Sequence, residues 1–315
     1  MSGECIMPEC LLCYGDINDT PGRYHSECLE NSILKDIDPL VPYAYSEINA
    51  LAENIIQSSF SITGVQPKIS MGTLEQTPAA KLTLVGYKGD FILKPPSPQF
   101  PQLPENEHLT MKLAAHLDIP VVPNALIPMA SGEICYITKR IDREGEKKLH
   151  MEDMAQITGR LTEHKYRGSV ETVGKAIYKH AAYTMFDVIS FFQLLLFCFI
   201  CGNTDMHLKN FSLIYTDKGL RFAPAYDLLN TAIVIDDAEE SALTINGKKN
   251  KLSMGDFESL GSTLHIPAKS RENTYTVYAA QKHTLCDIVS TSFLTDERKQ
   301  RYVACIQEHC SRLGL

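Results

Sequence analysis

The apolar positions of the chain follow two different periods. Between residues 61 and 143 they form short β-rich runs separated by turn residues, which predict strands over residues 81–85, 91–94, 124–128 and 134–140. One segment of this part is helical instead, because Leu109, Leu113 and Leu117 recur every four residues until Pro120 ends the period. The pattern therefore predicts one helix, over residues 105–117, packed on a sheet of hairpins.

Beyond residue 143 the apolar period becomes helical. The expected helices cover residues 151–158, 170–183, 186–201, 272–290 and 296–313, with a short β-like insertion at 210–223. A mostly β part followed by a mostly helical part predicts an α+β, two-lobed fold like that of protein kinases. We expect a cysteine-rich appendage over residues 1–45, an N-lobe over 46–143 and a helical C-lobe over 144–315.

Composition narrows the class of protein. The longest apolar run, residues 188–201, contains Ser190 and Gln193 and is shorter than the roughly 18 residues of a membrane span, so it predicts a buried helix. Ten cysteines follow no basic-then-apolar leader, which favours a reducing, cytoplasmic location. A net charge of −8 gives no broad basic face and argues against non-specific nucleic-acid binding as the main activity, so any DNA contact is expected through a partner.

A polar run, residues 202–210, directly follows the most apolar expected helix. Phosphoryl transfer needs a carboxylate near the attacking hydroxyl and an oxygen ligand for Mg²⁺, and kinases place these as Asp and Asn five positions apart. Asp205 and Asn210 have this spacing, and Asp227 follows a β-like stretch, as a second Mg²⁺-binding carboxylate would. The alternative is that Asp205 and Asn210 cap a turn and that Asp227 lies on the surface.

Two other side chains of the same run can contribute to this chemistry. His207 would brace the loop, and Lys209 would neutralise charge on the transferred phosphoryl group. Taken singly, a histidine or a lysine in a loop has little specificity, and either residue is as readily an ordinary loop residue.

The nucleotide end of such a site is predicted around Lys94, at the end of an expected strand, where its ammonium could reach the α- and β-phosphates. Strand-end lysines are otherwise usually solvated. On the helix that follows, Glu107 is preferred to Glu105 as the partner of Lys94. Backbone groups at the end of the 134–140 strand could bind adenine, and the residues expected there are Lys139, Arg140 and Ile141.

Taken together, these motifs resemble the HipA-like kinases, toxins of bacterial toxin–antitoxin systems. The resemblance runs from residue 61 to about 315 and rests on five ordered motifs, SITGVQPK (61–68), FILKP (91–95), ENEH (105–108), GNTDMHLKNF (202–211) and APAYD (223–227). It implies that Asp205 is the catalytic base, that Asn210 and Asp227 bind Mg²⁺, and that Lys94 binds the phosphates of ATP.

The resemblance also gives a meaning to residues 61–68, which carry one glycine and match neither G-x-G-x-x-G nor a Walker A motif. It makes them the phosphate loop, whose expected ATP-binding residues are Ser61, Ile62, Thr63, Gly64, Val65, Gln66 and Lys68. In this family the first serine of the loop is autophosphorylated, which is thought to eject the loop and stop the kinase. Ser61 and Thr63 are the corresponding acceptors here.

Within the family, the chain resembles the short HipT branch. The residues before the loop leave little room for the extra N-terminal subdomain of full-length HipA. HipT acts with a separate HipS protein and a HipB-like DNA-binding antitoxin, so HipS-like and HipB-like partners are implied. The implied substrate is an aminoacyl-tRNA synthetase, with the tryptophanyl enzyme as the best guess.

The cysteine-rich start contains two ligand pairs, Cys10 with Cys13 and His25 with Cys28, at the short spacing that tetrahedral Zn²⁺ sites use. Any such metal would be structural, because three cysteines and one histidine leave no open position. The alternative is four such residues in a reduced protein without metal.

Two rival functions remain open at this point. A kinase fold without activity could serve only to bind an antitoxin and DNA, although the presence of Asp205, Asn210, Asp227 and Lys94 argues against it. A small-molecule phosphotransferase uses a similar Asp-to-Asn loop, but the Ser61 loop and its Gln-Pro-Lys continuation favour a protein kinase.

Overall fold

The computed structural model describes residues 9–17, 22–50, 67–85, 89–145, 147–235 and 239–315. The chain divides into two compact units. The first unit comprises Met1–His108, Val122–Arg140 and Thr291–Leu294, and the second comprises Leu109–Val121, Ile141–Ser290 and Thr295–Leu315.

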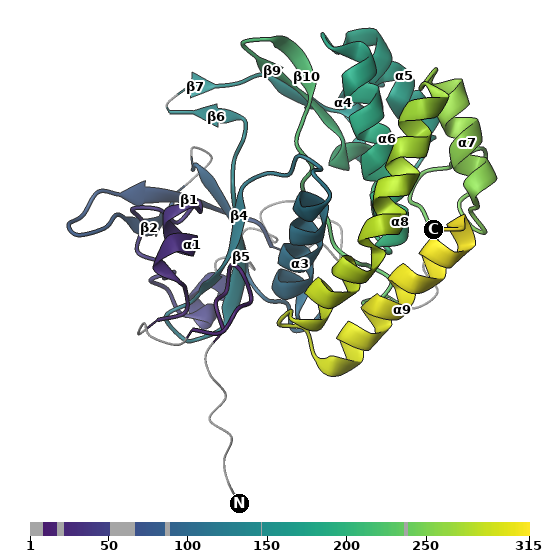
Figure 1. Ribbon diagram of the computed structural model, residues 1–315. Helices are drawn as coiled ribbons and strands as arrows, with labels where there is room; N and C mark the ends of the chain where they lie inside the picture. The colour runs from purple at the N-terminus through teal and green to yellow at the C-terminus, as the bar shows by residue number, and fades with distance from the viewer. Residues whose placement is uncertain (1–8, 18–21, 51–66, 86–88, 146, 236–238) are drawn as a thin grey trace, which may run out of the picture. The chain divides into compact units, whose positions relative to one another are not determined.

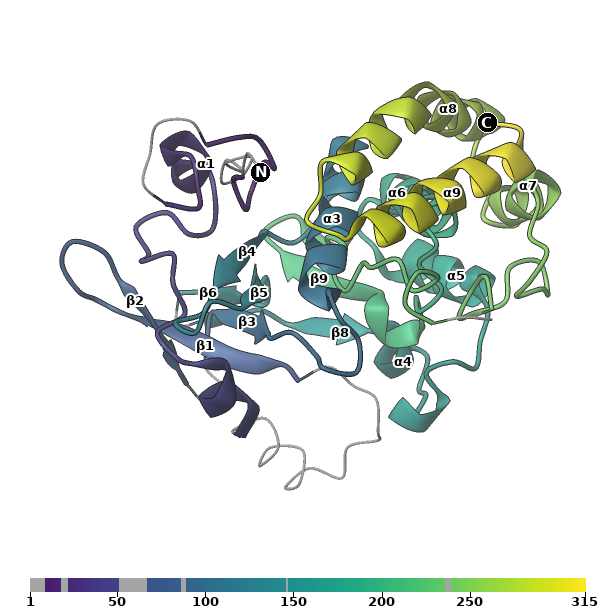
Figure 2. The ribbon, with the colours of Figure 1, turned by 90° about the horizontal axis from the view of Figure 1, so that it is seen from below.

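The first unit is built on an antiparallel sheet with strand order β2-β1-β3-β5-β4 (Figure 2). Its strands are β1 (Ile69–Leu74), β2 (Lys81–Leu84), β3 (Phe91–Lys94), β4 (Asn124–Pro128) and β5 (Ile134–Lys139). Apolar side chains of the sheet form one core with residues of the N-terminal segment, among them Leu11, Tyr24 and Leu34. This segment also holds the short helix α1 (Ser26–Glu30).

Helix α3 (Leu103–His116) begins in the first unit and ends in the second. It forms where the four-residue leucine period predicts it, and Leu109 and Leu113 are fully buried. Near the middle of the helix, Thr110 forms a 2.9 Å hydroxyl–hydroxyl hydrogen bond with Tyr302. The helix is therefore anchored by side chains along its length.

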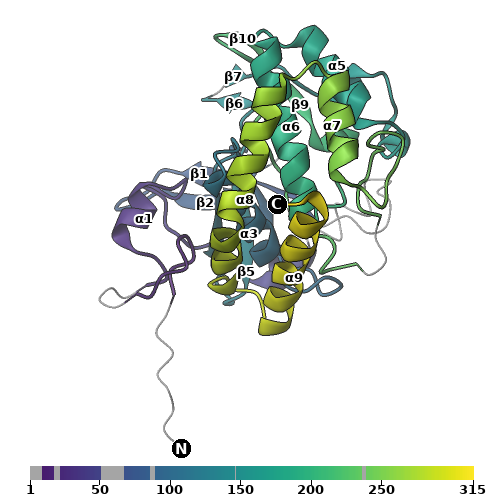
Figure 3. The same cartoon turned by 45° about the vertical axis from the view of Figure 1, so that its right-hand side comes forward.

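Helices dominate the second unit (Figures 1 and 3). They are α4 (Met154–Ile157), α5 (Val170–His180), α6 (Thr184–Ile200), α7 (Met254–Thr263), α8 (Ala268–Ser290) and α9 (Asp296–Leu313), with 3₁₀ turns η1 (Thr162–His164) and η2 (Leu208–Asn210). Two small sheets accompany them, one of β8 (Met151–Asp153), β9 (Ser212–Thr216) and β10 (Gly219–Phe222), the other of β6 (Arg143–Glu144) and β7 (Lys147–Lys148).

The apolar helix α6 lies at the centre of this unit. It packs on α8 through an edge-to-face contact of Phe192 with Tyr275 and through the Tyr278 hydroxyl, which donates to the Gln193 carbonyl at 2.8 Å. Its one buried charge, Asp187, accepts hydrogen bonds of 2.8–3.1 Å from Arg221 of β10. A buried carboxylate with such a partner avoids the cost of an isolated charge.

The α+β class predicted from the sequence is confirmed, with local corrections. Residues 151–158 were expected to form one helix, but they form strand β8 and then helix α4, because Asp153 caps α4 in a capping box with Gln156. Helices α1 and α7 and strands β1, β6 and β7 were not anticipated. Within the described part of the chain, no helix has both the length and the apolar content that crossing a lipid bilayer requires.

We expect Gly202→Ala to destabilise the protein by about 1–3 kcal/mol, because Gly202 follows α6 with a φ of +71° and a Cβ there would lie 2.7 Å from the Cys305 sulfur. Denaturant unfolding measures the change. Gly255→Ala is the matched control, since a Cβ at Gly255 meets only the Ser253 hydroxyl, at 3.8 Å. Equal stability of the two variants would contradict the steric requirement at Gly202.

Candidate active site

The 202–210 loop leaves the buried end of α6 and is held by hydrogen bonds to residues further along the chain. The Thr204 amide donates to the Thr231 hydroxyl at 2.7 Å, and the Thr231 hydroxyl donates to the Gly202 carbonyl at 3.1 Å. Asn203 is buried, and its side-chain oxygen accepts from the Asp205 amide at 3.2 Å. These bonds give the loop a defined shape.

Asp205 and Asn210 are brought together by this shape. The Asn210 side-chain amide donates to the Asp205 carbonyl oxygen at 3.0 Å, and the His207 amide donates to the same oxygen at 2.8 Å. Because the amide nitrogen of Asn210 is engaged, its amide oxygen is the atom that can coordinate a cation. The Asp205 carboxylate remains half-buried at the loop.

Tyr166 is a site residue that the sequence did not reveal. Its hydroxyl donates to Asp205 Oδ1 at 2.8 Å, although the side chain is 44% exposed. Partial burial and the hydrogen bond to Asp205 raise the pKa of Tyr166 above its ordinary value, so the hydroxyl stays protonated and orients one oxygen of the carboxylate. An exposed tyrosine 39 positions from Asp205 carries no spacing signal that could have identified it.

His207 belongs to the loop, and its side chain is turned away from solvent. It is buried, and its ring meets the edge of the Tyr166 ring at a centroid distance of 5.1 Å. Burial lowers the pKa of His207 below its usual range, against the opposing effect of the Asp205 carboxylate. The lowered pKa favours the neutral imidazole, and the ring is packed against Tyr166.

Lys209 forms an ion pair with Asp153, a residue that was not predicted from the sequence. Its ammonium lies 2.7 Å from Asp153 Oδ2. The Lys209 carbonyl oxygen also accepts a 3.0 Å hydrogen bond from the Tyr226 hydroxyl. Lys209 is thus held from both ends, and Asp153 offsets part of its charge.

Asp227 has a left-handed backbone, with a φ of +55°, which is uncommon for residues other than glycine but tolerated by Asp and Asn. The segment before it is tied down, because the Ala225 amide donates to the Pro120 carbonyl at 2.8 Å. Asp205 and Asp227 both belong to the second unit, and each carboxylate favours the charged form of His207 and so opposes the lowering of its pKa by burial.

In the first unit, Lys94 ends β3 as a buried residue and its ammonium lies 2.5 Å from Glu107 Oε1. The same ammonium lies 5.3 Å from the centre of the Tyr136 ring, which faces Lys94 across the β3–β5 pairing. A buried lysine needs such partners to stay charged. Of the two acidic residues considered from the sequence, Glu107 is the one that meets Lys94.

The expected adenine-binding residues follow the end of β5, and the boundary between the units falls between Arg140 and Ile141. The Lys139 amide donates to the Pro123 carbonyl at 2.9 Å, and the Arg140 amide donates to the Asp90 carbonyl at 2.7 Å. Those two amides are already used inside the first unit.

The expected phosphate loop lies mostly outside the described residues. Residues 61–66, which include Ser61, Ile62, Thr63, Gly64, Val65 and Gln66, fall in the segment 51–66 that the structure does not describe. Lys68, at the end of the loop, is described and exposed.

Cys10, Cys13, His25 and Cys28 form a cluster that is compatible with a metal site.

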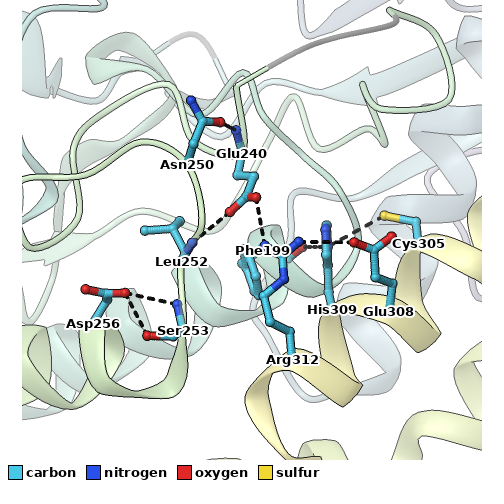
Figure 4. A network of polar contacts seen from close by, with 10 residues as sticks. All are labelled: Phe199, Glu240, Asn250, Leu252, Ser253, Asp256, Cys305, Glu308, His309 and Arg312. Carbon is cyan, nitrogen blue, oxygen red and sulfur yellow. Dashed lines mark hydrogen bonds and ion pairs between the residues drawn. The ribbon is translucent and has the colours of Figure 1, made fainter.

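A cysteine–histidine pair on α9 is a second arrangement that could suggest chemistry (Figure 4). His309 Nδ1 lies 3.6 Å from the Cys305 sulfur but 2.6 Å from the Phe199 carbonyl oxygen. A carbonyl only accepts hydrogen bonds, so Nδ1 carries the proton and cannot deprotonate the thiol. Burial raises the pKa of Cys305 to about 12. The pair therefore ties α9 to the end of α6 and is not an activated nucleophile.

Known proteins with similar sequences are named as kinases. The protein Y4dM of Sinorhizobium fredii, provisionally named a kinase, is 32% identical over 241 residues, which are 72% of this chain and 57% of that protein. The serine/threonine-protein kinase toxin HipA of Shewanella oneidensis is 25% identical over 217 residues, 59% of this chain and 46% of that protein. The chain spans 46–60% of the length of these curated relatives and two others.

Solved structures share the fold. HipA of Shewanella oneidensis, determined with HipB and its operator DNA, matches with a TM-score of 0.69 at 20% identity, covering 86% of this chain and 71% of that chain. The proinflammatory kinase CtkA of Helicobacter pylori matches with a TM-score of 0.52 at 14% identity, covering 78% of this chain and 93% of that chain. The fold is thus kinase-like.

One family model, described as the HipA-like C-terminal domain, matches residues 60–285. This range contains every residue that the second unit gathers around the 202–210 loop, together with Lys94 and Glu107 of the first unit. The chain belongs to the HipA-like C-terminal domain family.

Proposed function

We propose that this chain is an ATP-dependent serine/threonine protein kinase that acts as a bacterial toxin. The observation that carries the proposal is the 202–210 loop, in which one hydrogen bond holds Asn210 to Asp205 and a tyrosine hydroxyl orients the Asp205 carboxylate. A turn that only needed capping would not require an oriented carboxylate at its surface. The naming of relatives as kinases supports the same class of reaction.

Asp205 would accept the proton of a serine or threonine hydroxyl. The hydroxyl oxygen then forms a bond to the γ-phosphorus of ATP, the bond from this phosphorus to the β–γ bridging oxygen breaks, and ADP leaves. Tyr166 would hold Asp205 in place through its 2.8 Å hydrogen bond during this step. The buried His207 side chain, packed against Tyr166, would support the loop and would not exchange protons.

The donor set around the loop fits Mg²⁺. Asn210 presents an amide oxygen and Asp227 a carboxylate, and hard divalent cations prefer oxygen ligands of these two kinds. Bound there, Mg²⁺ would neutralise charge on the phosphates of ATP. The left-handed backbone of Asp227 orients this side chain at a conformational cost of about 1–3 kcal/mol, which is typical of functional positions.

Lys94 would bind the α- and β-phosphates, with Glu107 and Tyr136 holding its ammonium. Lys209 would contribute charge at the transferred phosphoryl group, moderated by Asp153. Residues 61–66 and Lys68 would form the phosphate loop. Backbone groups of Lys139, Arg140 and Ile141 would bind adenine. The amides of Lys139 and Arg140 already donate to the Pro123 and Asp90 carbonyls.

For the biological role, we propose a HipT-type toxin with HipS-like and HipB-like antitoxin partners. The HipA of Shewanella oneidensis was solved with HipB and DNA, which supports an antitoxin partner here. DNA contact would then be indirect. The proposed substrate is an aminoacyl-tRNA synthetase, with the tryptophanyl enzyme as the first to test.

We expect Asp205→Asn to reduce phosphoryl transfer from ATP by about 10²- to 10⁴-fold, because the variant lacks the proton acceptor. Incorporation of labelled γ-phosphate into the protein and into candidate synthetases measures the loss. Asp217→Asn is the matched control, since Asp217 is exposed in the β9–β10 turn, and it should retain wild-type activity. Full activity of Asp205→Asn would move the base elsewhere.

The same assay separates the rival functions. A chain that serves only to bind an antitoxin would transfer no phosphate in the wild-type form, whereas a small-molecule phosphotransferase would label sugars or antibiotics and leave proteins unlabelled.

We expect Asp227→Asn to remove the Mg²⁺-dependent part of ATP affinity, because the amide lacks the charge that binds the cation. Asparagine tolerates the left-handed backbone at this position, so the fold should persist. Calorimetric titration of ATP with and without Mg²⁺ provides the measurement. An unchanged difference between the two titrations would exclude Asp227 as a ligand.

We expect mass spectrometry of the purified active protein to find phosphate on Ser61, and on Thr63 if the second acceptor is used. A phosphate adds about −1.5 to −2 charges beside a loop that must approach the phosphates of ATP, so it should weaken ATP binding. Ser61→Ala should retain ATP affinity after incubation with ATP. Phosphate on Ser61 in the Asp205→Asn variant would mean that another kinase placed it.

A further inference from the structure

Four side chains near the N-terminus converge in a way that the proposed kinase reaction does not use. The sulfur atoms of Cys10, Cys13 and Cys28 and a ring nitrogen of His25 all lie within 4.8 Å of one another. With Zn–S bonds of about 2.3 Å, the ligand atoms of a tetrahedral site lie roughly 3.8 Å apart. The four atoms are therefore close to the spacing of a closed tetrahedral site.

The backbone between the first two cysteines is folded as a tight turn. The Tyr14 amide donates to the Cys10 carbonyl and the Cys10 amide donates to the Gly15 carbonyl, both at 2.9 Å. Tyr14 has a φ of +72°, and the Gly15 amide points at the Cys13 sulfur from 3.4 Å. An amide directed at sulfur stabilises a thiolate, which is the form that binds metal.

The orientation of His25 is a second, independent observation. Its Nε2 lies 3.0 Å from the Asp16 carbonyl oxygen, which can only accept, so Nε2 carries the proton. Its Nδ1 then presents a lone pair, at 3.2 Å from the Cys13 sulfur and 3.7 Å from the Cys28 sulfur. Metal-binding histidines are oriented in this way, with the second nitrogen donating to a carbonyl or carboxylate.

The turn also contacts helix α3 beside a proposed ATP-site residue. The Tyr14 hydroxyl lies 2.7 Å from His108 Nδ1, and the Tyr14 ring meets the rings of His108 and Phe293 edge to face. Tyr14 and His108 are both buried. His108 directly follows Glu107, the residue that pairs with Lys94.

We propose that Cys10, Cys13, His25 and Cys28 bind one structural Zn²⁺, and that the metal-bound turn braces helix α3 through Tyr14. The metal site stands on its own contacts, and only its importance for Lys94 rests on the proposed function. Four protein ligands leave no open position, so the ion is structural. Without metal, the turn would depend on its hydrogen bonds, its aromatic contacts and its apolar contacts with the sheet.

Elemental analysis of the full chain, purified without chelator or added metal, should find about one zinc per chain. Cys13→Ser, at an exposed ligand, should lose the zinc and unfold at a lower temperature, whereas Cys286→Ser, outside the cluster, should retain both. If Cys13→Ser does not fold, zinc released from the wild-type chain by a mercurial thiol reagent can be read with a chromogenic chelator. A metal-free chain whose unfolding temperature does not rise with zinc, or a chain with iron and sulfide instead, would overturn the proposal.

The bracing of α3 is tested by Tyr14→Phe, which removes the hydroxyl and retains the four ligands. We expect full zinc content and several-fold faster hydrogen exchange of the amides at residues 103–108. Tyr24→Phe is the matched control, because its hydroxyl donates to the Leu126 carbonyl at 2.9 Å, on β4 and not on α3. Equal α3 exchange in the two variants would overturn the bracing. Neither zinc content nor hydrogen exchange depends on kinase activity, so failure here is distinct from failure of the proposed function.

Discussion

The burial of helix α6 is the constraint on which the second unit depends. Its apolar side chains occupy most of its circumference, and each Phe or Leu contributes about 1.5–3 kcal/mol only if it is removed from water. The C-terminal end of such a helix must lie inside the protein. The chain that leaves it carries polar groups into this interior, and those groups must bond to one another.

That requirement explains why hydrogen bonds fix so much of the 202–210 loop. Asn203 and Asn210 each use a side-chain atom on the backbone of Asp205, and Thr231 reaches back to both ends of the Gly202–Thr204 stretch. Satisfying the buried polar groups fixes the backbone from which the Asp205 carboxylate projects. The backbone is therefore fixed at the positions that carry the Asp205 carboxylate and the Asn210 amide oxygen.

The sequence predicted those parts in which local pattern and tertiary packing agree. The leucine period of α3 and the apolar run of α6 are long enough to predict helices despite single polar residues within them. The five-residue spacing of Asp205 and Asn210 predicted that both lie on one loop. Helix α7 was missed because Gly255 and Gly261 weaken its helical signal.

The missing site residues have a different explanation. Tyr166 and Asp153 reach the loop from 39 and 56 positions away, and only the path of the backbone brings them there. No periodicity or motif spacing encodes such contacts. From the sequence, Glu107 could only be preferred to Glu105. The face of α3 that meets β3 decides between them, and that face is set by packing.

The two oxygen atoms of Asp153 have separate partners, which restricts what evolution can place at this position. Oδ1 accepts from the Gln156 amide to start α4, while Oδ2 accepts from the Lys209 ammonium. Serine, threonine or asparagine could begin the helix but would leave the ammonium without its counter-charge. Glutamate could balance the charge, yet its longer side chain makes a poor helix start. A single short carboxylate thus links the fold of one segment to the electrostatics of another, and substitution there is expected to be rare among relatives that retain both features.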